Sequence, residues 1–181
     1  VPSLKEVESM KAIKSQLRAD GFDTPLVADV HFNPKVAEAM ASVVEKVRIN
    51  PGNYVDKRNF SQLDLSDADY QTAVERMGKR AQPLFEICKQ HDTTLRLGIN
   101  HGSLCDRIVS RYGNTPNAMV QSALEWIDIC EYYNFEKVVI SMKASNVLTM
   151  MEATLGLKQA MDSRKASYPL HLGVTEAGAG V

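Results

Sequence analysis

Polar side chains suited to anion binding occur where short apolar runs of the sequence end. In "EKVRINPGNYVD", residues 45–56, Val47 and Ile49 alternate with Arg48 and Asn50 before a Pro-Gly pair ends the run. Because side chains alternate along a strand, Arg48 and Asn50 are expected on the same face. Arginine binds phosphate oxygens through two parallel hydrogen bonds, and an asparagine amide donates hydrogen bonds without adding charge. The pattern fits either the solvated face of an edge strand or an anion site at a strand end.

Polar residues stand in a similar way at the ends of four further apolar runs. In "TLRLGIN", for example, Arg96, Gly98 and Asn100 alternate with leucine and isoleucine. A single strand end of this kind is often structural, but its recurrence at every run indicates one shared site. The polar residues at the five ends are Asp29 and His31, Arg48 and Asn50, Arg96 and Asn100, Ser141 and Lys143, and Thr175 and Glu176.

This polar row would place three cations, Arg48, Arg96 and Lys143, beside the carboxylates of Asp29 and Glu176. Converging cations repel one another unless the carboxylates or a bound anion compensate them. A diphosphate carries a suitable charge, and arginine and lysine are well matched to phosphate oxygens. The other members of the row are His31, whose charge is tunable near neutral pH, and the hydrogen-bonding residues Asn50, Asn100 and Ser141.

Helical and strand-like segments alternate along the chain, beginning with a helix before the first apolar run. Helix starts are indicated at Asn33-Pro34, Ser66, Thr115-Pro116 and Ser145 or Asn146, where a capping side chain precedes helical periodicity. The long helix that starts at Ser66 contains Pro83, which is expected to kink or split it. Strands are expected over residues 25–30, 46–50, 94–100, 137–142 and 168–176.

The strand faces distinguish two α/β architectures. Helical connections between strands imply a parallel sheet, in either a doubly wound fold or part of a (β/α)8 TIM barrel. A doubly wound sheet is covered by helices on both faces, so both faces should be apolar. Here the face carrying Val30, Ile49, Leu97 and Ile140 is apolar, whereas the opposite face is polar. The expected fold class is therefore α/β, a parallel partial TIM barrel with its site at the carboxyl ends of the strands.

Composition excludes several other classes of protein. The chain has 181 residues, 24% of them charged, and a net charge of −1, without the basic surplus of a nucleic-acid-binding protein. No apolar run approaches the roughly 20 residues of a membrane span, and the first residues lack the apolar core of a signal peptide. Cys88, Cys105 and Cys130 are widely spaced, which favours a reducing compartment and argues against a metal or iron–sulfur site made by this chain alone.

Five motifs, in order, resemble those of the 4-hydroxy-3-methylbut-2-enyl diphosphate synthase family of the non-mevalonate isoprenoid pathway. The motifs are "PLVADVHF", "VRINPGN", "RLGINHGSL", "SMKAS" and "LHLGVTEAG". The segment "NYVDKRNF" and the long helix after it resemble the plant, chlamydial and Bacteroidetes branch. The resemblance implies about strands 3 to 7 of the barrel, in a bacterial cytoplasm or a plant plastid stroma.

The resemblance also implies an activity and roles for individual residues. Enzymes of the family are oxidoreductases that open the ring of 2-C-methyl-D-erythritol 2,4-cyclodiphosphate with two electrons from ferredoxin or flavodoxin, passed through a 4Fe–4S cluster. Asp29 and His31 would line the substrate pocket, and Glu176 would act near the reacting carbon as acid/base or orienting group. The residues that would hold the diphosphate are Arg48, Asn50, Arg96, Asn100 and Lys143.

Two departures from the family pattern define what this chain is expected to do alone. The cluster ligands of the family, three cysteines and a glutamate, lie on a separate carboxyl-terminal domain, and the three cysteines here match none of its motifs. The second departure is an incomplete barrel, because the resemblance would place the first two strands before Val1 and the eighth after Val181. Residues 1–181 are therefore expected to form one incomplete substrate-binding barrel domain, without a cluster and inactive by itself. Its unpaired edge strands favour association into a homo-oligomer.

Two other functions remain open on the residues alone. An aldolase could use Lys143 as a Schiff-base lysine, which would require its pKa to be lowered by burial or neighbouring cations. A non-catalytic scaffold could bind anions or assemble with itself. Borohydride trapping with a carbonyl substrate would identify the aldolase.

Overall fold

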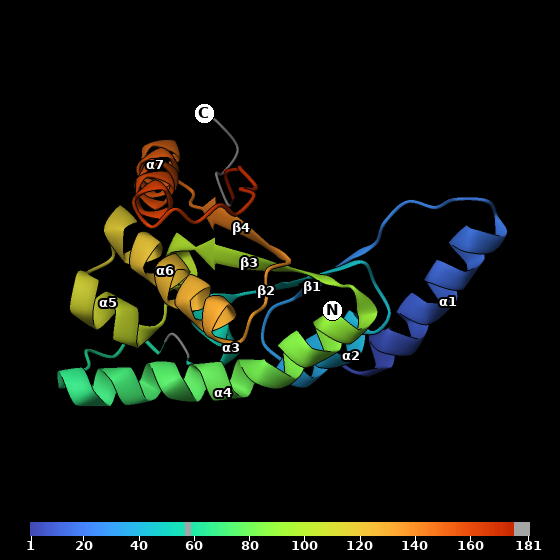
Figure 1. Cartoon of the computed structure of the whole chain (residues 1–181), viewed down its shortest axis with the longest axis horizontal. Helices are drawn as coiled ribbons and strands as arrows, with labels where there is room; N and C mark the ends of the chain where they lie inside the picture. The colour runs from blue at the N-terminus through green and yellow to red at the C-terminus, as the bar shows by residue number, and fades with distance from the viewer. Residues whose placement is uncertain (57–58, 176–181) are drawn as a thin grey trace.

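The computed structural model describes residues 1–56 and 59–175, which form an α/β arrangement around one parallel sheet (Figure 1). The sheet contains four strands in the sequential order β1-β2-β3-β4. The strands are β1 (Val27–Val30), β2 (Lys46–Ile49), β3 (Thr94–Asn100) and β4 (Val138–Lys143). Sequential parallel order is that of a barrel wall, as expected, and the described sheet does not have the doubly wound order.

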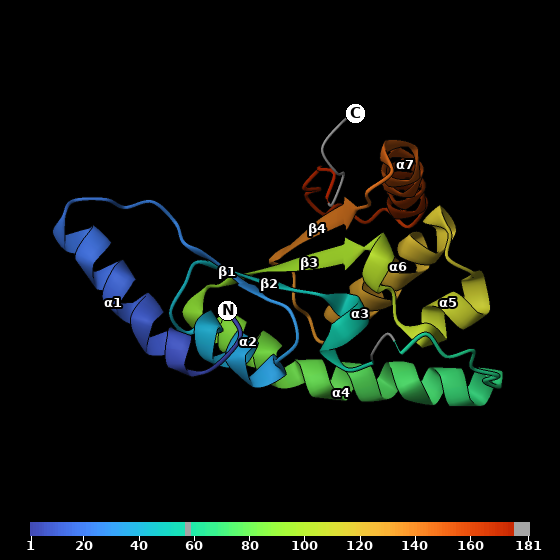
Figure 2. The ribbon, with the colours of Figure 1, turned by 180° about the vertical axis from the view of Figure 1, so that it is seen from behind.

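Helices connect the strands and cover one face of the sheet. Figure 2 shows the same arrangement from behind, with α1 projecting away from the other elements. Contacts join α2 to β1 and β2, α6 to β3, and α7 to β4. The elements outside the sheet are α1 (Lys5–Ala19), α2 (Pro34–Ala41), α3 (Pro51–Tyr54), α4 (Asp67–His91), η1 (His101–Ser103), α5 (Asp106–Tyr112), α6 (Pro116–Tyr132) and α7 (Val147–Ser163).

Local sequence signals account for several of the helix starts. Asn33, Ser66, Thr115 and Asn146 each accept a hydrogen bond from a backbone N–H of the first turn, so the expected N-caps are confirmed. The long helix α4 is continuous through Pro83, so of the two predicted effects, a kink or a split, the split is wrong. Most of α4 lies on one side of the core, and tertiary packing outweighs the single hydrogen bond that proline removes.

The two faces of the sheet differ as the sequence predicted. The helix-covered face is apolar and buried, with Ile49, Leu97 and Ile140 at 0% exposure and Val30 at 2%. On the opposite face, Val27 and Asp29 are exposed. Charged and hydrogen-bonding side chains therefore have one uncovered face of the sheet available to them.

The fifth expected strand, residues 168–176, is not formed over its described part. Leu170 makes an isolated parallel bridge with Ile140, through Ile140 N–H to Pro169 O at 2.9 Å and His171 N–H to Ile140 O at 2.8 Å. Proline has no N–H to donate, and no described strand lies beyond this segment to complete a ladder. The segment thus follows the edge of β4 without continuing the sheet.

A buried ion-pair network fixes the connection between α3 and α4. The guanidinium of Arg107 donates to Asp56 at 2.9 Å and makes two hydrogen bonds of 2.9 Å to Glu125. It also lies over the ring of Tyr70 at 4.5 Å. Burial acts to lower the pKa of Arg107, but the bonds and charge of Glu125 prevail and raise it. Arg107 stays charged and joins α4, α5 and α6 around this connection.

The carboxylate of Glu45 makes the ion pairs that attach helix α1, and Lys14 of this helix also donates to the Val43 carbonyl at 2.7 Å. Glu45 accepts from Lys14 at 2.7 Å and Arg18 at 3.1 Å on α1, and from the backbone N–H of Leu26 at 2.8 Å. Desolvation acts to raise the pKa of Glu45, but the hydrogen bonds from Lys14 and from the backbone, with the charge of Lys14, lower it to about 2. On α1 itself only Val7 is buried, so few apolar contacts replace these polar ones.

The attachment of α1 should weaken as pH falls from 4.5 to about 2. The pKa of Glu45 is 4.5 in the unfolded state and about 2 when α1 is attached, so the unfolded state binds the proton first. Once protonated, Glu45 no longer forms its ion pairs with α1. Amide hydrogen exchange of α1, measured across this range, reports the loss. Glu45→Gln should remove most of the pH dependence, whereas Glu8→Gln should not, since Glu8 belongs to an exposed pair within α1. Equal pH dependence in Glu45→Gln and the unaltered protein would contradict this account.

Candidate functional site

The candidate site is the uncovered face of the sheet near the carboxyl ends of its strands. Asp29, Arg48 and Arg96 occupy paired positions on β1, β2 and β3, since Asp29 pairs with Arg48 and Arg48 with Arg96. Farther along the strands, Asn100 pairs with Lys143. Parallel register therefore brings the predicted cations to one face of the sheet. We call the predicted polar residues on this face the inner row. Its members are Asp29, His31, Arg48, Asn50, Arg96, Asn100, Ser141 and Lys143.

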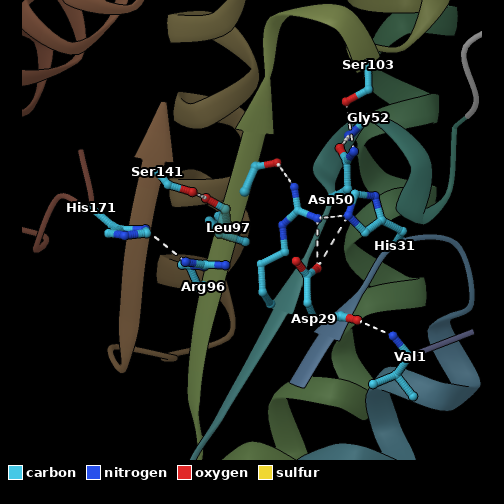
Figure 3. Close-up of polar contacts among 12 residues, drawn as sticks. Val1, Asp29, His31, Asn50, Gly52, Arg96, Leu97, Ser103, Ser141 and His171 are labelled. Carbon is cyan, nitrogen blue, oxygen red and sulfur yellow. Dashed lines mark hydrogen bonds and ion pairs between the residues drawn. The ribbon is translucent and has the colours of Figure 1, made fainter. Parts of the chain in front are cut away.

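Arg48 is the most enclosed charged group of the inner row, with 8% of the residue exposed. Its guanidinium donates to Asp29 Oδ1 at 2.9 Å and to the backbone carbonyl of Gly98 at 3.3 Å, and it contacts His31 Nε2 (Figure 3). His31 Nε2 also lies 3.5 Å from Asp29 Oδ1. The three acceptors hold the Arg48 side chain across β3 and partly neutralise it.

Gly98 provides the space that Arg48 occupies. A Cβ atom at this position would lie 2.1 Å from Arg48 Nε and 2.8 Å from its Cζ, closer than nonbonded atoms approach. The group that approaches the Gly98 backbone is therefore the guanidinium of Arg48. Glycine is thus required here by packing of the inner row.

Arg96 has weaker protein partners than Arg48. One terminal nitrogen lies 2.9 Å from His171 Nδ1, while its buried Nε has no hydrogen-bond partner among the described residues. Burial and then the charge of Arg48 lower the pKa of Arg96, and Asp29 opposes the shift. An added anion would relieve both the unsatisfied donor and the repulsion.

Asn50 and Asn100 both shape the loops that follow their strands. Asn50 accepts from Gly52 N–H at 3.1 Å and donates to Ser103 Oγ at 2.8 Å, and Asn100 accepts from Gly102 N–H at 3.0 Å. Asn50 lies just beyond β2, as the N-cap of α3, although the sequence placed it within the strand. Their carbonyl oxygens are therefore engaged in capping.

The last strand ends contribute Ser141 and Lys143. Ser141 is buried and donates to the Leu97 carbonyl at 3.4 Å. Within residues 1–56 and 59–175, Lys143 makes no hydrogen bond or ion pair, and its Nζ would lie 3.4 Å from a Cβ placed at Gly173. The predicted catalytic residue Glu176 lies outside the described residues, so its role remains a prediction.

His171 is a member of this face that the sequence analysis missed. The bridge between Leu170 and Ile140 places His171 next to Ser141, and Figure 3 shows its ring directed toward Arg96. The signal was present, because His171 alternates with Leu170 and Leu172 as the inner residues of the other strands do.

The described residues do not fit an iron–sulfur cluster. Cys88, Cys105 and Cys130 are all buried, and burial raises the pKa of Cys88 and Cys130 to about 12, whereas cluster ligands are thiolates. In the described part of the chain, no group of three or more His, Cys, Asp or Glu side chains is placed to hold a metal ion.

No described helix has the length and apolar character to cross a membrane.

A separate cavity of about 510 Å³ lies between the connection after α3 and helices α4 and α5. Its lining includes the carboxylates of Asp56, Asp69 and Asp106. Of its two cations, Arg76 is already paired with Asp56, and Arg107 with Asp56 and Glu125. This cavity is therefore less suited to an anion than the inner row is.

The fold and the inner row define a (β/α)-barrel domain with a cationic face at the carboxyl ends of its strands. The chain belongs to the GcpE TIM-barrel domain family, whose model matches residues 1–181. This finding confirms the predicted family and the barrel-type fold class.

Relatives of the chain include three bacterial proteins named 4-hydroxy-3-methylbut-2-en-1-yl diphosphate synthase (flavodoxin). The chain is 52% identical to that of Parabacteroides distasonis over 177 residues, 97% of this chain and 29% of the relative. Identity is 49% to the protein of Chlamydia muridarum, covering 100% of this chain and 30% of the relative. Identity is 47% to the protein of Leptospira interrogans, covering 99% of this chain and 27% of the relative. The chain thus spans less than a third of the length of these relatives.

Gly98→Ala is expected to displace the Arg48 guanidinium, because the new methyl group would overlap Arg48 Nε. Overpacking of this kind costs about 1–3 kcal/mol of unfolding free energy. Denaturant unfolding and a crystal structure of the variant measure the two effects. Gly102→Ala is the matched control, since a methyl group there would meet its nearest neighbour at 3.6 Å. An unmoved Arg48 side chain in Gly98→Ala would show that the packing argument is wrong.

Proposed function

We propose that this chain is the substrate-binding barrel part of an oxidoreductase that reductively opens 2-C-methyl-D-erythritol 2,4-cyclodiphosphate to 4-hydroxy-3-methylbut-2-enyl diphosphate. The names of its relatives support the product, and the inner row supports the diphosphate. The observation that carries the proposal is the register pairing of Arg48 with Arg96 on the uncovered face of the sheet. Two paired arginines at strand ends are placed to bind one anion that has several oxygens.

The proposed binding exchanges protein acceptors for phosphate oxygens. Arg48 would move one or more of its N–H donors from Asp29 and His31 to the anion. Arg96 would donate its unpaired Nε–H. Lys143 would add a point charge. Asn50 and Asn100 would donate through their amide nitrogens while their oxygens continue to cap the loops. Ser141 would contribute its hydroxyl group.

We propose that residues outside the described part of this chain carry out the redox part of the reaction. The names of the relatives include flavodoxin, so we propose flavodoxin as electron donor, with ferredoxin as the alternative. We propose that a 4Fe–4S cluster passes the electrons and that residues outside this chain hold it, since the described cysteines do not fit it. We further propose that Glu176 orients the substrate or moves a proton near the reacting carbon, and that the enzyme is a homo-oligomer.

In the intact enzyme, Arg48→Ala or Arg96→Ala should weaken binding of the cyclodiphosphate. Each substitution removes charge-assisted hydrogen bonds and leaves phosphate oxygens unpaired, at a cost on the order of 2–5 kcal/mol. This cost corresponds to roughly 30-fold to several-thousand-fold in affinity, which calorimetry measures. Lysine at either position should recover only part of the loss, because it keeps the positive charge but lacks the two parallel N–H donors of a guanidinium.

Arg164→Ala is the matched control for these variants. Arg164 caps α7 and pairs with Asp128 on the outer surface, so its loss should leave substrate affinity unchanged. Cluster absorbance should persist in all three alanine variants. Affinity like that of the unaltered enzyme in both Arg48→Ala and Arg96→Ala would refute the proposed anion site.

A further inference from the structure

His171 is held against Arg96 from both its backbone and its ring. Its backbone N–H donates to the Ile140 carbonyl at 2.8 Å, and the preceding bridge ties Leu170 to the same residue of β4. Its Nδ1 lies 2.9 Å from a terminal nitrogen of Arg96 (Figure 3). The histidine therefore contacts the inner row at the cation with an unsatisfied donor.

The geometry specifies the charge state of this ring. A guanidinium can only donate, so Nδ1 must accept, and the imidazole is neutral with its proton on Nε2. The charged groups that act on His171 are Arg96 from β3, Lys143 from β4 and Lys46 from β2. Burial first, and then these three cations, lower the pKa of His171 below its ordinary value of 6.5. The surroundings thus favour the neutral ring as long as no anion is bound.

We propose that His171 is a further anion-binding residue of the inner row, which positions Arg96 in the empty site and takes up a proton when a diphosphate binds. This inference rests on the proposed function, because the anion is the diphosphate bound by that site. The proton comes from solvent, so one neutral imidazole and one proton become an imidazolium paired with the anion.

The exchange follows from the electrostatics of the site. A diphosphate between Arg96 and Lys143 would reverse the local potential, and an opposite charge within about 4–6 Å favours the protonated form of histidine. Protonation of Nδ1 would also end its hydrogen bond with Arg96, which frees that N–H group for the anion. Both partners would then donate to phosphate oxygens.

The expected pH dependence has a definite sign. The pKa of His171 is low in the empty site and rises on binding, so proton uptake occurs between these two values. Affinity for the anion should therefore increase as pH falls through this window, and the contribution of His171 should level off below the pKa of the empty site. Above the pKa of the bound state, His171 adds no charge.

Calorimetry of the intact enzyme with inorganic pyrophosphate tests this inference. Titrations at several pH values, each in two buffers of different ionisation enthalpy, give the number of protons taken up. The unaltered enzyme should take up more protons than His171→Gln, by up to about one proton at the optimal pH. His171→Gln should also bind roughly tenfold more weakly at low pH, as expected for one lost charge-assisted bond. His91→Gln, altered at the exposed end of α4, should match the unaltered enzyme in both measurements.

Different outcomes separate this inference from the proposed function. Equal proton uptake in His171→Gln and the unaltered enzyme overturns the role of His171, while pyrophosphate binding that depends on Arg48 and Arg96 keeps the site. An unaltered enzyme that binds no pyrophosphate overturns both. Should His171→Gln fail to fold, the imidazole nitrogen shifts of His171 in the unaltered enzyme decide, because pyrophosphate must move them toward the protonated form.

Discussion

The central electrostatic constraint on this structure is the pairing of two arginines across adjacent parallel strands. Arg48 and Arg96 stand opposite each other in the register of β2 and β3, where their charges repel. Asp29, His31 and the Gly98 carbonyl surround Arg48, and His171 faces Arg96. These partners compensate the repulsion only in part, since Arg96 Nε lacks a partner within the described chain. The remaining imbalance is what a bound anion would remove.

The rest of the fold serves to hold this pair in place. Helices bury the opposite face of the sheet, where Ile49, Leu97 and Ile140 have no exposed surface. The loops beyond β2 and β3 are fixed against each other, because Asn50 donates to Ser103 and a Cβ at Gly52 would lie 1.8 Å from the Ser103 carbonyl oxygen. Such close packing leaves the strand ends little freedom, so the backbone positions that carry the two arginines are fixed before a ligand arrives, and only the side-chain contacts of Arg48 change.

Much of this arrangement was predictable from the sequence, since alternation along each strand identifies which residues share a face. The partners of each side chain were not predictable, because they depend on register and on space between strands. The sequence does not show that Gly98 makes room for Arg48, and Asn50, which was expected to end a strand, caps α3. The fifth run has the composition of a strand, yet it forms only one bridge at the sheet edge, and that bridge placed the overlooked His171 beside Arg96.

The most direct test of the central claim is a crystal structure of the intact enzyme with inorganic pyrophosphate. The account predicts the anion on the inner row between Arg48, Arg96 and Lys143, with a phosphate oxygen bonded to Arg96 Nε. It also predicts that Arg48 has given up its contact with Asp29 or His31. An anion bound elsewhere, with the contacts of Arg48 unchanged and Arg96 Nε still unpaired, would contradict it.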